Sequence, residues 1–104
     1  MPEPVALFLR HTVRAGQRAA VQAVWHRHMA PAVATNPEHR AYAYCEDADD
    51  PEAVCAFQVY DSPEAASAFL RTEAYAAYLR EVEPLLEGPP AVTRLAPVWT
   101  KGLG

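Results

Sequence analysis

The stretch AVCAFQVYDSPEAASAFLR, residues 53–71, decides the fold because a strand leads directly into a helix within it. Its first part, residues 53–60, has the apolar and aromatic composition of a β-strand. Ser62 can then cap a helix, Pro63 suits the first helical position, and Glu64 lies at the positive end of the helix dipole. We therefore expect a short helix from here to the end of the stretch.

The sequence before this stretch predicts two more strands and one long helix. Residues 40–46 form a hairpin with residues 53–60, because the six residues between them, DADDPE, are acidic and rich in turn formers. Residues 5–14 have the composition of another strand. Apolar side chains at helical spacing predict a helix over residues 17–34, which we expect to kink or break at Pro31.

A second helical run and a final strand follow the stretch. Thr72 can cap this run, whose apolar spacing continues to Leu86, although Pro84 should kink it or end it early. A Gly-Pro-Pro sequence then stops the helix. Residues 91–101 predict the last strand, in which Pro97 suits an edge or a bulge.

The resulting order, β-α-β-β-α-β, predicts an α+β fold of the ferredoxin-like kind. Such a fold has a four-stranded antiparallel sheet with both helices on one face. The 104 residues have the length of one domain, which we expect to span residues 1–104 with its core at about residues 5–100.

The strands carry apolar side chains on both faces, although two helices can cover only one. In the first strand, for example, alternation places Val5, Leu7 and Leu9 on one face and Ala6 and Phe8 on the other. A second sheet from an identical subunit is the simplest cover for the remaining face. We therefore expect a homodimer that closes two sheets into a dimeric α+β barrel. The alternative is a looser monomer with an apolar surface.

Charge and hydropathy argue against several classes of partner. The net charge is −4 and the arginines are scattered rather than gathered in a basic stripe, so we expect no nucleic acid partner. The apolar runs are too short to span a bilayer and no export signal is apparent, so we expect a cytoplasmic protein without a membrane partner. We expect Cys45 and Cys55 to face each other across the hairpin and to remain thiols in that compartment; the alternative is a cross-strand disulfide.

The spacing of these elements resembles the antibiotic biosynthesis monooxygenase (ABM) family. The resemblance is carried by FQVYDSPEAASAFLRTEAYAAYLREVEPLLEGPPAVTRL, residues 57–95, and it is most specific over residues 57–90. It extends from Ala6 to about Val98. It implies a dimeric α+β barrel. It also implies oxygenation of polycyclic phenols and quinols without a bound cofactor, and some relatives degrade haem.

The chain departs from the family's pattern on the third strand and the second helix. Gln58, Val59 and Tyr60 stand where the family commonly has Glu-x-Trp, and Ala74 stands where a His often precedes the aromatic at Tyr75. Haem-degrading relatives share a His on the second helix, which this chain lacks. We therefore expect neither haem chemistry nor any other cofactor.

Tyr60 and His11 are the candidates for catalysis in such an oxygenase. The reaction requires the protein to exclude water, orient a ring and move a proton. Tyr60 holds the family's Trp position and can stack on a substrate ring or hydrogen-bond its oxygen; otherwise it is a core tyrosine. His11 can accept a proton at neutral pH; otherwise it is a hydrogen-bonded interface histidine.

Six further residues are candidates for contacting the substrate: Arg10, Trp25, His28, Gln58, Tyr75 and Tyr78. Arg10 and His11 are consecutive and point to opposite faces of their strand, so only one of them faces the helices. The aromatic candidates on the helices lie on apolar stripes and are core residues in the alternative interpretation. His26 and His28 stand two apart on a helix and do not face each other, so we expect no metal site.

These observations favour a cofactor-independent monooxygenase acting on an aromatic, quinol-like small molecule. The alternative is a non-catalytic dimeric α+β barrel protein that binds a small hydrophobic ligand, which the missing Glu, Trp and His favour. An isomerase or cyclase of the same barrel class is a third hypothesis, with only histidines to serve as its base.

Overall fold

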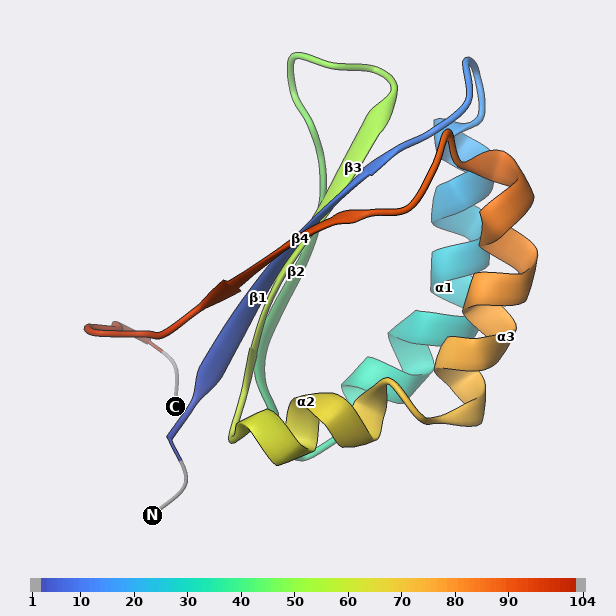
Figure 1. Ribbon diagram of the computed structural model, residues 1–104. Helices are drawn as coiled ribbons and strands as arrows, with labels where there is room; N and C mark the ends of the chain where they lie inside the picture. Colours follow the sequence, from blue (N-terminus) through green and yellow to red (C-terminus); the bar gives the residue numbers. More distant parts are fainter. Residues whose placement is uncertain (1–2, 103–104) are drawn as a thin grey trace.

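The computed structural model describes residues 3–102 and contains the elements in the predicted order (Figure 1). They are β1 (Val5–Thr12), α1 (Arg18–Ala34), β2 (His39–Glu46), β3 (Ala53–Tyr60), α2 (Pro63–Phe69), α3 (Glu73–Val82), η1 (Glu83–Leu85) and β4 (Ala91–Leu95). The four strands form one antiparallel sheet in the order β2-β3-β1-β4. The helices lie on one side of this sheet, which confirms the ferredoxin-like prediction (Figure 1).

Side-chain caps begin the two short helices where the sequence predicts them. The Ser62 hydroxyl accepts the backbone N–H of Ala65 at 3.1 Å and caps α2. The Thr72 hydroxyl accepts the N–H of Tyr75 at 3.3 Å and caps α3. Near Pro84 the α-helix gives way to the short 3-10 turn η1, so the predicted early end of this helix is confirmed.

Two elements differ from the prediction. The helix α1 does not break at Pro31 but continues to Ala34, and the Thr35 hydroxyl donates to the Pro31 carbonyl at 2.8 Å. The last strand is shorter than predicted, because β4 ends at Leu95. The chain beyond it includes Pro97, which has no N–H to donate to a neighbouring strand.

The inner face of the sheet packs against the helices, whereas the outer face is apolar and open in a single chain. The core includes Val5, Leu7, Val21, Val24, Trp25, Met29, Val54, Tyr60, Phe69, Tyr78 and Val82. On the outer face, Phe8 and Phe57 are direct cross-strand partners, and each is 38% exposed. The pairing of Cys45 with Cys55 across the hairpin is confirmed, and both are free thiols. None of the helices within residues 3–102 is long and apolar enough to cross a membrane.

Candidate functional site

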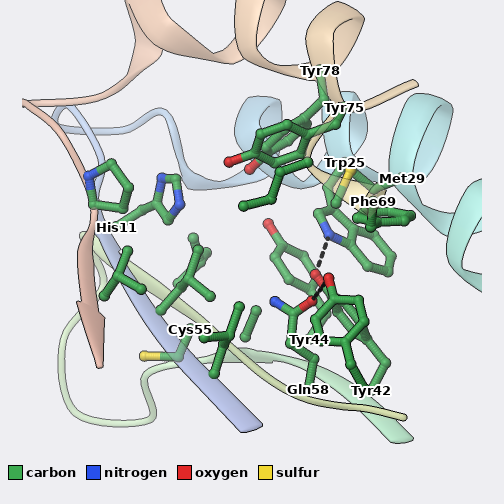
Figure 2. A pocket seen from close by; sticks show the side chains of 18 residues that line it. His11, Trp25, Met29, Tyr42, Tyr44, Cys55, Gln58, Phe69, Tyr75 and Tyr78 are labelled. Carbon is green, nitrogen blue, oxygen red and sulfur yellow. Dashed lines mark hydrogen bonds between the residues drawn. The ribbon is translucent and has the colours of Figure 1, made fainter. Parts of the chain in front are cut away.

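A cavity of about 100 Å³ lies between the inner face of the sheet and the helices (Figure 2). Its walls are mostly apolar. All five tyrosines of the chain line it: Tyr42 and Tyr44 from β2, Tyr60 from β3, and Tyr75 and Tyr78 from α3. A dry cavity of roughly 150 Å³ is known to hold benzene in another protein. The cavity therefore has the size for about one aromatic ring.

His11, on β1, supplies a histidine to the cavity wall. It is 7% exposed, and its Nδ1 has no hydrogen-bond partner among the described residues. Burial lowers the pKa of His11, so the imidazole is neutral at pH 7. His11 and Pro90 also border a second hollow of about 390 Å³. The buried ring therefore lies between two hollows, and its Nδ1 has no partner within the part of the protein that the structure describes.

Gln58, on β3, carries a second polar group of the cavity. Its Oε1 accepts the O–H of Tyr60 at 2.5 Å and lies 3.3 Å from Nε2 of His39. Burial raises the pKa of Tyr60, so this hydroxyl keeps the proton that it donates. Figure 2 shows the amide nitrogen of Gln58 turned toward the interior of the cavity. Gln58 therefore offers an N–H group to a ligand.

Trp25, from α1, and Tyr44 form a flat aromatic wall. Their ring planes are parallel within 2°, and their ring centroids are 4.2 Å apart. The indole N–H of Trp25 donates to the hydroxyl of Tyr42 at 3.4 Å (Figure 2). The hydroxyl of Tyr44 is buried without a partner among the described residues, and burial raises its pKa. The wall thus combines a stacked surface with a neutral hydroxyl that is free to bond.

Six of the eight residues predicted from the sequence line the cavity: His11, Trp25, Gln58, Tyr60, Tyr75 and Tyr78. Arg10 points to the outer face and pairs with Asp47 at 2.5 Å and Asp50 at 2.9 Å. Nε2 of His28 lies 2.8 Å from a carboxylate oxygen of Glu81, between α1 and α3. Arg10 and His28 therefore have structural partners and do not line the cavity.

The sequence interpretation missed three residues of β2. Tyr42 and Tyr44 line the cavity, and His39 stands behind Gln58. The alternation in HRAYAYCE was the available signal for the two tyrosines, because residues two apart on a strand share a face. Within residues 3–102, no group of three or more His, Cys, Asp or Glu side chains could hold a metal ion.

Comparisons with known proteins agree with this architecture. Residues 4–81 match the family model described as antibiotic biosynthesis monooxygenase. The solved structure of Rv0793 from Mycobacterium tuberculosis is 31% identical, with 94% of this chain and 98% of that chain covered and a TM-score of 0.84. A Chloroflexus aurantiacus structure named for the same monooxygenases is 24% identical, with coverages of 98% and 100% and a TM-score of 0.83. One from Nitrosomonas europaea is 15% identical, with coverages of 98% and 97% and a TM-score of 0.87. These last two support the fold alone. No functionally curated protein matches the sequence significantly.

Proposed function

Because the chain belongs to the antibiotic biosynthesis monooxygenase family, we propose that it oxygenates a quinol or phenol with one aromatic ring and needs no bound cofactor. One observation carries the proposal. A neutral, buried imidazole with an unpaired Nδ1, that of His11, lines an aromatic cavity of about ring size. This pairing of a free base with an enclosed aromatic surface is what deprotonation of a phenol requires.

In the proposed reaction, His11 accepts the proton of a ring hydroxyl, and the electron-rich anion then reduces dioxygen directly. For a hydroquinone, one oxygen atom forms a C–O bond in place of a ring C–H bond, and the other leaves as water. The substrate gives up four electrons and becomes a hydroxyquinone. His11 returns its proton to the departing oxygen, so the residue is unchanged after a turnover.

The aromatic wall supplies the remaining requirements of this reaction. The stacked pair Trp25 and Tyr44 offers a flat surface on which a ring can lie, and Gln58 offers an N–H to one of its oxygens. Enclosure excludes water, which would otherwise compete for the anion. The volume of about 100 Å³ favours one ring over the polycyclic substrates that the family resemblance implies.

We propose further that a second copy of the chain covers the outer face of the sheet. Phe8 and Phe57 lie side by side there, and the exposed Leu95 continues the apolar surface on β4. Contiguous exposed apolar surface of this kind marks protein interfaces. The family resemblance implies the same partner.

Oxygen uptake tests the enzymatic proposal, with single-ring hydroquinones as substrates and anthrones as three-ring comparisons. We expect uptake with the hydroquinones, strong loss in His11→Ala and partial loss in Tyr60→Phe. His26→Ala is the matched control, because His26 is an exposed histidine of α1. Tight binding of aromatic compounds without uptake would contradict the proposal and favour the non-catalytic binding protein. Faster turnover of anthrones than of hydroquinones would contradict the single-ring assignment.

A further inference from the structure

We infer that His39 sets the hydrogen-bond polarity of the cavity, so that the site binds an aromatic ring through an acceptor oxygen such as a ketone or a phenolate. The inference rests on the proposed function only in assuming that the cavity binds an aromatic ligand; it does not require turnover. His39 acts through Gln58 and is therefore a positioning residue.

The hydrogen bonds that orient His39 begin at a backbone amide next to β2. The N–H of Glu38 lies 3.2 Å from Oδ1 of Asn36, and a backbone N–H can only donate. The oxygen of the Asn36 amide is therefore placed by a group of known polarity. The other end of the amide, Nδ2, lies 3.0 Å from Nδ1 of His39. Because Nδ2 can only donate, Nδ1 of His39 must accept.

An imidazole that accepts at Nδ1 carries its proton on Nε2. Nε2 of His39 lies 3.3 Å from Oε1 of Gln58, so it donates to that oxygen. Burial lowers the pKa of His39, which agrees with a neutral ring. Tyr60 and Phe69 hold the ring in place, with centroids 4.3 and 4.7 Å from its own.

The orientation of the Gln58 amide follows from this donor. Its Oε1 receives the N–H of His39 and the O–H of Tyr60, so its nitrogen is left to face the cavity (Figure 2). Tyr60 alone would not decide the orientation, since a hydroxyl can donate to an amide oxygen or accept from an amide nitrogen. His39 decides it, because its Nδ1 is already used as an acceptor.

The orientation of the Gln58 amide determines which ligand groups the cavity can bind. The cavity presents an N–H at Gln58 and an unpaired imidazole at His11. A ring hydroxyl that loses its proton to His11 leaves a negatively charged ring, which makes an oxygen substituent elsewhere on that ring a stronger hydrogen-bond acceptor. An N–H at Gln58 stabilises that oxygen, whereas a carbonyl in its place would repel it. The hydrogen bonds from Asn36 through His39 to Gln58 thus give the cavity the polarity that an anionic intermediate needs.

Two isosteric probes test the inference. Acetophenone carries a carbonyl acceptor, and α-methylstyrene has the same shape without one. We expect the wild-type protein to bind acetophenone about tenfold more tightly, which is the effect of one net hydrogen bond. His39→Phe keeps an aromatic ring beside Tyr60 but removes the N–H, so the preference should fall to about threefold or less. His39→Gln retains one donor and one acceptor and should restore it.

A second measurement needs no ligand and no variant. Nitrogen-15 NMR of the wild-type protein reports which nitrogen of His39 carries the proton, and we expect Nε2. A proton on Nδ1, or a full tenfold preference in His39→Phe, would overturn the inference. If oxygen uptake fails while the acetophenone preference holds, only the monooxygenase proposal falls. If neither probe binds, the ligand-binding premise falls, and with it the inferred ligand preference.

Discussion

Replacing His11 with leucine should make the protein more stable while abolishing its proposed activity. The imidazole is 7% exposed and its Nδ1 is unpaired among the described residues, so the folded state carries an unsatisfied polar group in an apolar setting. An unsatisfied buried group costs about 1–3 kcal/mol, and an apolar side chain of similar size removes that cost. At neutral pH we therefore expect His11→Leu to raise the free energy of unfolding by roughly 1–3 kcal/mol.

The difference in the free energy of unfolding between His11→Leu and the wild-type protein should grow in acid. Burial lowers the folded-state pKa of His11 below the ordinary histidine value of about 6.5. Below pH 6.5, the unfolded chain therefore binds a proton that the folded chain does not, and stability falls with falling pH until the folded pKa is reached. The slope approaches about 1.4 kcal/mol per pH unit for one such group. His39 has a lowered pKa for the same reason, so the variant should lose about half of the combined slope.

Urea denaturation at about pH 7.5, 6.5 and 5.5, at one protein concentration, measures both effects. His26→Leu is the matched control, because it removes an exposed histidine from α1. Destabilisation of His11→Leu by more than about 1 kcal/mol at neutral pH would refute the reasoning, because it would mean that the imidazole already has a partner. An unchanged slope would refute it as well.

Three further substitutions test the cavity, the outer face and a cap. Tyr60→Phe should cost about 1 kcal/mol of stability for one lost hydrogen bond. Tyr75→Phe is the matched control, because the Tyr75 hydroxyl makes no hydrogen bond among the described residues; an equal loss of stability there would contradict the assignment. Wild-type protein should sediment at twice the 11.4 kDa chain mass and Phe57→Asp at the chain mass, whereas a wild-type monomer would contradict the dimer. Ser62→Ala should lower the free energy of unfolding, measured by urea denaturation, by about 1 kcal/mol. Ser67→Ala, on the exposed face of α2, should lower it far less, and equal losses in the two variants would contradict the capping role of Ser62.

Local signals predicted the fold well because they act over a few residues. Ser62 and Thr72 cap their helices by bonding N–H groups three residues on, a contact that is visible in the sequence itself. Elements that depend on distant contacts were predicted less well. The helix α1 continues past Pro31 without a break, which its packing against the core allows, although the local rule permits a break there.

The candidate site shows the same division between local and distant information. Alternation along β1 predicted that Arg10 and His11 face opposite sides, but not which of them faces the helices. The acidic hairpin turn decides it, because Asp47 and Asp50 bind Arg10 on the outer face and His11 is left inside. A distant loop therefore completes an inference that the strand alone left open.

The sequence interpretation missed His39 because its orientation depends on a β-bulge, which an alternation pattern does not reveal. Residues 39 and 42 differ by three, so a regular strand would place them on opposite faces. A bulge between His39 and Ala41 shifts the register and brings His39 to the same side as Tyr42. Bulges of this kind redirect side chains, and they are common next to functional sites.

The distribution of unpaired polar groups argues that the cavity is a binding site rather than a packing defect. Within the part of the chain that the structure describes, only two buried side-chain nitrogen or oxygen atoms lack a hydrogen-bond partner: Nδ1 of His11 and the hydroxyl of Tyr44. Both atoms belong to residues that line this cavity. A packing defect would be lined by apolar groups, because each unpaired polar atom costs about 1–3 kcal/mol. A ligand with a flat ring and polar atoms placed to meet these two groups would remove that cost, so the two atoms indicate what the cavity binds.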